Sequence, residues 1–179
     1  MTIPHASRAF EADHGLLETL QRVLTIQSPD LGGALTEACN LIADALGADK
    51  VDVFLYEAEN ETLVALGTST TEVGIRQHQT GMDRQPLANG GTAVRVFHSG
   101  EMYHTGHADQ DPEQLRGMIE GLRIRSDITV PLDVQEARRG VLSAVSVARD
   151  AFTEADLSPA RADEASPEAH FVSRLPSRE

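Results

Sequence analysis

Apolar and polar positions fall into blocks along this chain, and the clearest blocks lie between residues 124 and 157. Two apolar runs rich in β-branched residues, 128–134 and 141–148, flank a polar turn at residues 135–140. This pattern predicts an antiparallel hairpin. Both runs carry apolar residues on both faces, so we expect the hairpin in the middle of a sheet that is covered on both sides. Pro131 lacks an N–H and is expected at a bulge or where no partner strand needs one.

Helical periodicity dominates the first part of the chain. An apolar stripe made of Leu16, Leu17, Leu20, Val23 and Leu24 predicts a first helix. One amphipathic stripe is compatible with packing on the same domain and with a seam between two copies, so both uses stay open. Residues 31–46 repeat apolar positions at the same period and predict a second helix, which Gly47 ends.

The middle of the chain is expected to supply the remaining strands. Residues 51–56 and 62–67 predict two strands joined by a turn at residues 57–61. Residues 73–79 predict a weaker third strand, which is polar and therefore belongs near the sheet edge or beside a cavity. Residues 101–105 predict another short strand.

Short helices are expected between these strands. Asn89, Gly90 and Gly91 form a turn signal before a helix over residues 92–98, which ends at Gly100. Pro112 is typical of a first helical turn, so a helix is expected from there through residue 120. Thr153, followed by acidic residues, predicts the start of a last helix.

The order of elements predicts an α+β fold. We expect one antiparallel sheet with the N-terminal helices on one face and the short helices on the other. The expected divisions are a lead at residues 1–14, one domain at residues 15–157 and a disordered tail at residues 158–179, where three prolines prevent one continuous helix.

Composition narrows the class of protein. The net charge of −13 argues against nucleic acid and anionic membrane surfaces as partners. No apolar run is long enough to span a membrane, and residues 1–13 lack the apolar core that is typical of a signal peptide. The single cysteine, Cys39, cannot form an internal disulfide, so a cytoplasmic location is expected. Cys39 has no basic neighbour in sequence, which favours a structural thiol over a nucleophile.

The central hairpin and its flanks resemble a known family. Residues 124–157 are similar to the C-terminal half of a GAF domain through the motifs Ile-Arg-Ser, Val-Pro-Leu, Gly-Val-Leu-Ser and Phe-Thr-Glu-Ala-Asp-Leu. The Pro-Leu and Gly-Gly signals at residues 86–91 are similar to the segment that forms one wall of the pocket in that family. The resemblance spans residues 16–157. It implies a small-molecule-binding sensory module with a GAF/PAS-like six-stranded antiparallel sheet, which often forms a homodimer through its N-terminal helix.

Known chemistries of that family find little support in the residues. No glycine-rich phosphate loop, nucleophile elbow or His-Glu-x-x-His motif is present. One subfamily reduces methionine sulfoxide with several cysteines, and another attaches a tetrapyrrole to a cysteine near the pocket helix. The single Cys39, which lies in a predicted helix before the first strand, fits neither chemistry. The His, Cys and acidic residues also show no standard metal-ligand spacing. The cyclic-nucleotide signature is broken, because Ala148, Arg149 and Leu157 replace three of its residues, although Phe152 and Asp156 match it. We therefore expect no enzyme and no metal, and leave the cofactor unknown; haem, cyclic nucleotide and reductase chemistry remain alternatives.

The resemblance implies a pocket for an unidentified small molecule. By position in the family, the residues expected to line it are Phe54, Leu87, Asn89, Thr92, Val94, Met118, Ser126 and Thr129. The expected function is a non-catalytic signalling module that binds a small ligand, forms a homodimer and acts on a signalling protein. The alternative is an interaction domain with a vestigial pocket.

Overall fold

A six-stranded antiparallel sheet organises the molecule, and the expected α+β fold is confirmed. The computed structural model describes residues 18–19 and 21–152. The strand order is β3-β2-β1-β6-β5-β4. In chain order the strands are β1 (Lys50–Glu57), β2 (Thr62–Thr68), β3 (Arg84–Pro86), β4 (Tyr103–Thr105), β5 (Ser126–Val134) and β6 (Ala137–Ser146).

The predicted hairpin is β5 with β6, and it occupies the middle of the sheet as expected. Its turn is shorter than predicted, because only Gln135 and Glu136 separate the strands, both with positive φ (52° and 63°). Pro131 pairs with Val141, next to a register shift at Leu132 and Asp133. Strand β4 reaches only as far as Thr129, so Pro131 lies where no neighbour on that side needs its N–H.

Helix α2 (Leu31–Leu46) covers one face of the sheet over β1 and β2. Asp30 caps its first turn by accepting from the Gly33 N–H at 2.8 Å, and Gly47 ends it in the left-handed conformation, as predicted. Its buried residues include Cys39, which packs with Val51 and Val53 of β1. Residues 18–19 and 21–24 are also helical, and the rest of the predicted first helix lies outside the described residues.

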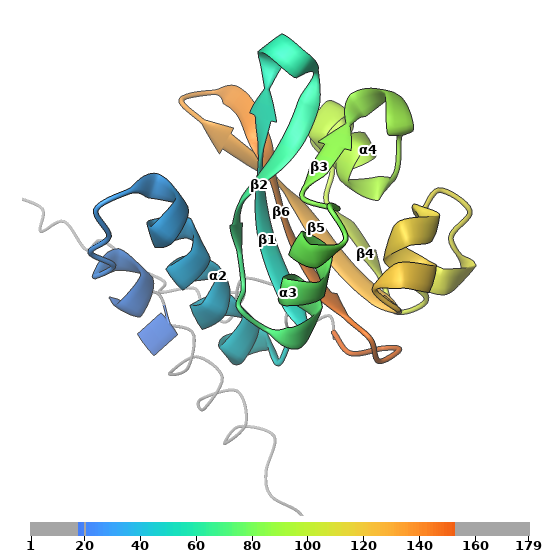
Figure 1. The fold of residues 1–179 in the computed structure, drawn as a ribbon, viewed down its shortest axis with the longest axis horizontal. Helices are drawn as coiled ribbons and strands as arrows, with labels where there is room; N and C mark the ends of the chain where they lie inside the picture. Colours follow the sequence, from blue (N-terminus) through green and yellow to red (C-terminus); the bar gives the residue numbers. More distant parts are fainter. Residues whose placement is uncertain (1–17, 20, 153–179) are drawn as a thin grey trace, which may run out of the picture.

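The opposite face is covered by shorter pieces. Helix α3 (Glu72–Gln79) lies over β1, helix α4 (Thr92–Ser99) lies over β5 and β6, and one π-helical turn, η4 (Gly117–Gly121), completes the cover. Figure 1 shows α2 on one side of the sheet and α3 and α4 on the other. The side chains of β1 alternate between these two layers: Val51 and Val53 face α2, whereas Phe54 faces α4.

The strand predicted at residues 73–79 is wrong, because this segment is helix α3. Thr71 caps the helix by accepting from the Gly74 N–H at 3.2 Å, and Glu72 follows in the first turn. The buried side chains are Val73 and Gln77, which are four residues apart and therefore share a helical face. The third strand of the chain is instead β3, a short edge strand.

Other boundaries also differ from the predictions. The helix predicted from Pro112 through residue 120 is wrong in its first part, because regular helical structure there is confined to η4, preceded by turns. The helix predicted over residues 92–98 and its stop at Gly100 are confirmed. Three further 3-10 turns, η1 (Ala58–Asn60), η2 (Leu87–Asn89) and η3 (Ala108–Gln110), connect the elements. The predicted helix start at Thr153 lies outside the described residues.

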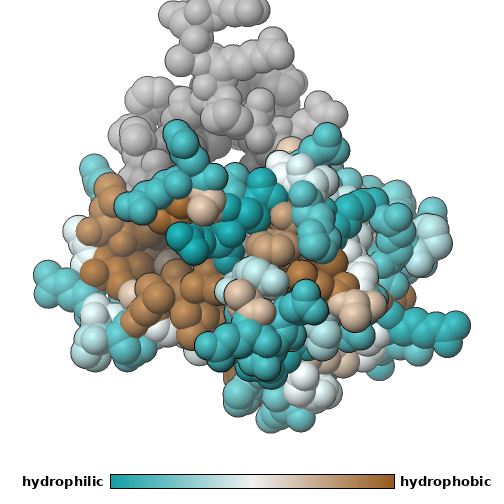
Figure 2. Space-filling model, turned by 90° about the horizontal axis from the view of Figure 1, so that it is seen from above, coloured by the Kyte–Doolittle hydropathy of each residue, from teal (hydrophilic) through white to brown (hydrophobic). Residues whose placement is uncertain are grey.

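Apolar surface gathers on the side of the molecule where α2 lies, as Figure 2 shows. Helix α2 covers β1 and β2, whereas three apolar residues of β5 and β6 that pack against the same core, Val130, Leu132 and Leu142, are only partly buried. Leu24 is 84% exposed and Leu31 is 60% exposed. Within the described residues, no helix has the length and apolar character that crossing a membrane requires.

Candidate functional site

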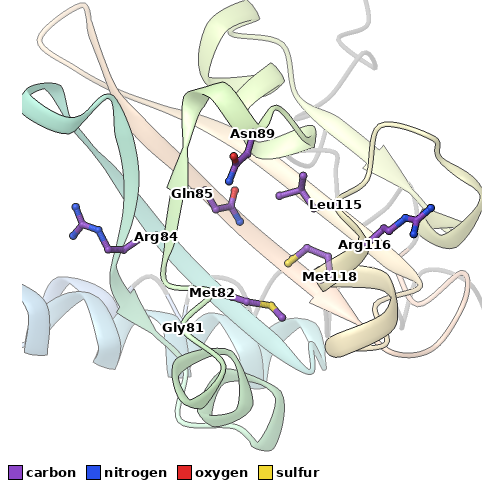
Figure 3. Close-up of a pocket in the computed structure, with 9 residues that line it drawn as sticks. Gly81, Met82, Arg84, Gln85, Asn89, Leu115, Arg116 and Met118 are labelled. Carbon is purple, nitrogen blue, oxygen red and sulfur yellow. The ribbon is translucent and has the colours of Figure 1, made fainter.

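A pocket of about 410 Å³ opens on the face of the sheet that carries α3 and α4. One wall is β3 with the segment before it and Asn89 of η2, and the other wall is residues 115–118. In Figure 3 the side chains of Gln85, Asn89 and Leu115 point toward the space between the walls, whereas Arg84 and Arg116 point away from it. The pocket therefore has an inner lining of amides and apolar groups.

Gln85 is the most unusual residue of this lining. Strand β3 alternates exposed, buried and exposed positions, so Gln85 at its centre faces inward and is only 7% exposed. Its backbone pairs with Leu63 of β2, but its side-chain amide has no hydrogen-bond partner among the described residues. Because Gln85 lines the pocket, its unpaired amide reaches solvent through the pocket and stays available for a hydrogen bond there.

The bottom of the pocket is made of flexible apolar side chains. Met82 and Met118 approach from opposite walls (Figure 3). Met82 lies against the two glycines of η4, since a Cβ on Gly121 would come within 2.9 Å of the Met82 Cε atom. Methionine adapts its shape with little loss of packing energy, and π-helical turns occur frequently at functional sites. This floor can therefore adjust to what the pocket holds.

Beneath the floor, the sheet carries a buried polar network whose first part centres on Lys50. The Lys50 ammonium group forms an ion pair with Asp52, and neither side chain is exposed. Gln77 of α3 lies over this pair: its Oε1 accepts from the Lys50 ammonium at 2.5 Å, and its Nε2 donates to the Asp52 carboxylate at 2.9 Å. The burial of Gln77 is thus explained by the charges that it contacts.

The second part of the network centres on Asp127 of β5, which is 2% exposed. Its carboxyl group accepts from Gln114 Nε2 at 2.7 Å, from Thr129 Oγ1 at 2.8 Å and more distantly from Thr92 Oγ1 at 3.4 Å. Burial raises the pKa of Asp127, and these hydrogen bonds together with the charge of Lys50 only partly oppose the shift. Among the described residues, no cationic side chain forms an ion pair with Asp127.

The segment that carries Gln114 is tied down at several points. Tyr103 donates to the Asp111 carboxylate at 2.5 Å, and Glu113 forms an ion pair with Arg95. Burial and the bond to Asp111 raise the pKa of Tyr103. Leu115 packs against Gly91, where a Cβ would come within 2.8 Å of Leu115 Cγ. Residues 111–118 thus form a cover that places Gln114 on Asp127 and Leu115 in the pocket.

The structure places the predicted site residues in three groups. Asn89 and Met118 line the pocket, and Val94 together with Asn89 lines a neighbouring hollow of about 420 Å³. Thr92 and Thr129 belong to the buried network around Asp127.

The three remaining predicted residues lie elsewhere. Phe54 and Leu87 pack in the core beneath α4. Ser126 donates to the Ala148 carbonyl at 2.7 Å and occupies the alternate face of β5, away from the pocket.

Sequence reasoning missed Gln85, Lys50 and Asp127. Lys50 and Asp52 alternate with Val51 and Val53 at the start of a strand, and this alternation signals one apolar face and one polar face. Asp127 and Thr129 alternate with Ile128 and Val130 in the same way. What the pattern lacks is any indication that the polar face is covered.

Reactive and metal-binding groups are sparse in the described part of the chain. Cys39 is fully buried, and burial is the main cause that raises the pKa of its thiol to about 12. The search for three or more His, Cys, Asp or Glu side chains able to hold a metal ion together finds none among the described residues.

Comparisons with known proteins identify the family. No curated protein matches the chain significantly. Among solved structures, a GAF domain of a phosphoenolpyruvate-protein phosphotransferase from Coxiella burnetii is 20% identical, with a TM-score of 0.68 over 83% of this chain and 84% of that one. Its counterpart from Acinetobacter is also 20% identical, with a TM-score of 0.65 over 82% of this chain and 84% of that one.

An enzyme shares the same fold. A free methionine-R-sulfoxide reductase from Neisseria meningitidis, solved in complex with its substrate, is 20% identical, with a TM-score of 0.65 over 87% of this chain and 85% of that one. At this level of identity, all three likenesses establish the fold alone. The family model described as GAF domain matches residues 28–162, which is well over half of the 179 residues. The chain therefore belongs to the GAF domain family of sensory and regulatory modules.

Proposed function

We propose that this protein is a sensory GAF module that binds a small molecule in the pocket between β3 and residues 115–118. The observation that carries the proposal is Gln85, a residue that is 7% exposed as a whole and whose side-chain amide lies in the pocket lining without a hydrogen-bond partner among the described residues. Pockets of a few hundred Å³ with an apolar lining and a few convergent polar groups are typical small-molecule sites. The volume of about 410 Å³ fits that class.

The ligand can be sought by thermal-shift screening of metabolites, including nucleotides, amino acids and haem. A true ligand at a hundred times its dissociation constant adds about 2.7 kcal/mol to the free energy of unfolding. Gln85→Leu should abolish the stabilisation by the best ligand, because Leu fills similar space without hydrogen-bonding atoms. Gln79→Leu, at an exposed position on α3, is the matched control and should leave the stabilisation by that ligand unchanged. Equal stabilisation of both variants would contradict the proposed site.

We also propose that the module forms a homodimer through its N-terminal helical segment and the apolar surface near α2, and that a signalling protein reads the arrangement of the dimer. This is supported by the 84% exposure of Leu24 and by the incomplete cover of Val130, Leu132 and Leu142. A ligand would act by binding one arrangement of the dimer more tightly than another.

Analytical ultracentrifugation tests the dimer. Leu24→Asp should shift the protein toward monomer, because it places a charge in the apolar contact. Ile75→Asp, on the exposed side of α3, should not change the oligomeric state, although Ile75 is also 50% exposed. A wild-type protein that stays monomeric at high concentration would refute dimerisation and leave ligand binding untouched.

We further propose that the module lacks catalytic activity of its own. Thiol chemistry needs a thiolate, and the single cysteine of the chain, Cys39, is buried with a pKa raised to about 12. The reductase neighbours share the fold and supply the direct test, an assay of free methionine sulfoxide reduction. Turnover that depends on Cys39 would overturn this part of the proposal.

A further inference from the structure

The buried carboxyl group of Asp127 differs from the other charged groups of the polar network, because only neutral groups bind it directly. Lys50 and Asp52 neutralise each other in an ion pair. Asp127 receives one amide and two hydroxyl hydrogen bonds, from Gln114, Thr129 and Thr92. A buried carboxylate without a cation is costly, and a cation brought into contact with it is strongly favoured.

Asp127 lies close beneath the pocket. The sheet register places Lys50, Val145 and Asp127 side by side on β1, β6 and β5. Val145 belongs to the same apolar cluster as Met118, which forms the pocket floor. Neighbouring strands are about 4.8 Å apart, so Asp127 lies about one strand spacing from Val145, the residue that packs below the pocket floor.

A removable group separates the pocket from this carboxyl group. Gln114 places its amide nitrogen on Asp127 at 2.7 Å, and the next residue, Leu115, already lines the pocket. Gln114 comes from a segment of turns, not from the sheet or a long helix. A rotation of this one side chain would join the pocket to Asp127, and the position of its nitrogen marks where a ligand nitrogen would be bound.

We propose that the ligand of this pocket carries a primary ammonium group that takes the place of the Gln114 amide on Asp127, with an apolar body held between Met82, Leu115 and Met118. The proposal rests on the proposed function of the pocket and names the chemical class of its ligand. Charge-assisted hydrogen bonds are roughly twice as strong as neutral ones, so the ammonium group displaces the amide. The net charge of −13 favours the approach of a cation.

The nearby charges do not prevent this binding. Lys50 lowers the pKa of Asp127 through its charge, but its ammonium group is already bound to Asp52 and Gln77. Tyr103 of β4, whose pKa is raised in part by Asp127, stays neutral. Helix α4 and the cover segment present Thr92 and Gln114 to Asp127, and neither of these residues titrates.

The test is an NMR titration of the ¹⁵N-labelled full chain with three probes of similar shape at equal ionic strength: isoamylammonium chloride, isoamyl alcohol and sodium isovalerate. The ammonium probe should bind about tenfold more tightly than the alcohol, because only a cation stabilises the ionised form of the Asp127 carboxyl group and forms a charge-assisted hydrogen bond with it. Asp127→Asn should abolish the difference between the two probes. Asp44→Asn, which removes the same charge from an exposed position on α2, should preserve it.

A second variant keeps the test decisive if Asp127→Asn does not fold. Gln114→Ala removes the amide that competes for Asp127 and should tighten binding of the ammonium probe several-fold without tightening binding of the alcohol. Weaker or unchanged ammonium binding in this variant would overturn the proposal. The proposal would also be overturned if the alcohol or the carboxylate binds the wild-type protein as tightly as the ammonium probe does, or more tightly. If that binding is lost in Gln85→Leu, the pocket remains a ligand site. Binding of none of the three probes would overturn the proposal as well.

Discussion

Lys50 and Asp52 form an ion pair in which neither side chain is exposed to solvent. They are two residues apart on β1, so both point to the same face of the sheet, and Gln77 of α3 bonds to both. Because the pair lies under α3, that helix is positioned partly by charge and not by apolar packing alone. Helix α3 leads directly into the segment before β3, which forms part of one pocket wall, so this link ties that segment to the centre of the sheet.

Removing one member of this pair should be strongly destabilising. Lys50→Met leaves the Asp52 carboxylate buried with only the Gln77 amide, and we expect the free energy of unfolding to fall by about 3–5 kcal/mol. Urea denaturation followed by circular dichroism measures the loss. Lys50→Met combined with Asp52→Leu should recover about half of it, because no charge then remains buried. If the single and double variants are equally unstable, the loss is one of packing and the ion pair is not its cause.

The hairpin and α2 could be predicted from the sequence because their signals are local. β-Branched runs around a short turn specify β5 and β6, and the apolar period with Gly47 specifies α2. The strand predicted over residues 73–79 is wrong because a glutamine in the sequence gives no sign that it is buried, so the helical pairing of Val73 and Gln77 is not visible there. Its burial depends on Lys50, which lies 27 residues away in sequence.

The candidate site was only partly predictable for the same reason. Asn89 and Met118 were found through the family resemblance, and both line the pocket. Gln85 and Asp127 were missed, because a polar residue in a strand gives no sign of whether another segment covers it. Gln114 covers Asp127 from a loop that the sequence predicted as part of a helix. Such a relationship exists only once the tertiary fold has formed.

The stability of the protein should depend on pH through Asp127. Burial raises the pKa of this carboxyl group in the folded state, so the folded protein holds a proton that the unfolded chain releases. Asp127 therefore lowers the free energy of unfolding as the pH rises from its unfolded value, about 3.9, up to its folded pKa. Lys50 and Tyr103 are the titratable groups that interact with it.

Asp127→Asn isolates this contribution. Asn matches the shape of the protonated carboxyl group: its Oδ1 can accept from Gln114 Nε2, and its Nδ2 can donate to Thr129 Oγ1, so the variant should fold. Urea unfolding between about pH 4 and about pH 8 should show that the stability of the variant, relative to wild type, rises with pH, because the variant has no proton to lose. Asp44→Asn provides the exposed control, for which this relative stability should stay flat. A relative stability of Asp127→Asn that falls with pH would mean that the native carboxyl group is ionised and stabilising.

Cys39 should resist labelling in the native protein. Its thiol is fully buried between α2, to which Cys39 belongs, and β1, and burial is the main cause that raises its pKa to about 12. We expect the rate of reaction with iodoacetamide at neutral pH to be at least about a hundredfold lower in the folded protein than in urea, because reaction needs both opening and ionisation. Mass spectrometry of timed samples measures both rates. Rapid labelling of the folded protein would instead support the reductase alternative.

Arg138 should fix helix α4 to the central hairpin. Its guanidinium group donates to the carbonyl groups of Phe97 at 2.7 Å and Val96 at 3.2 Å and forms an ion pair with Asp133. Arg138→Gln loses bonds to a helix C-terminus, so we expect the free energy of unfolding to fall by about 1–2 kcal/mol. Arg139→Gln is the matched control, because Arg139 is exposed and has no partner among the described residues. Hydrogen exchange should rise in α4 only for Arg138→Gln, and a uniform rise across the sheet would show that the bond acts on global stability instead of on the position of the helix.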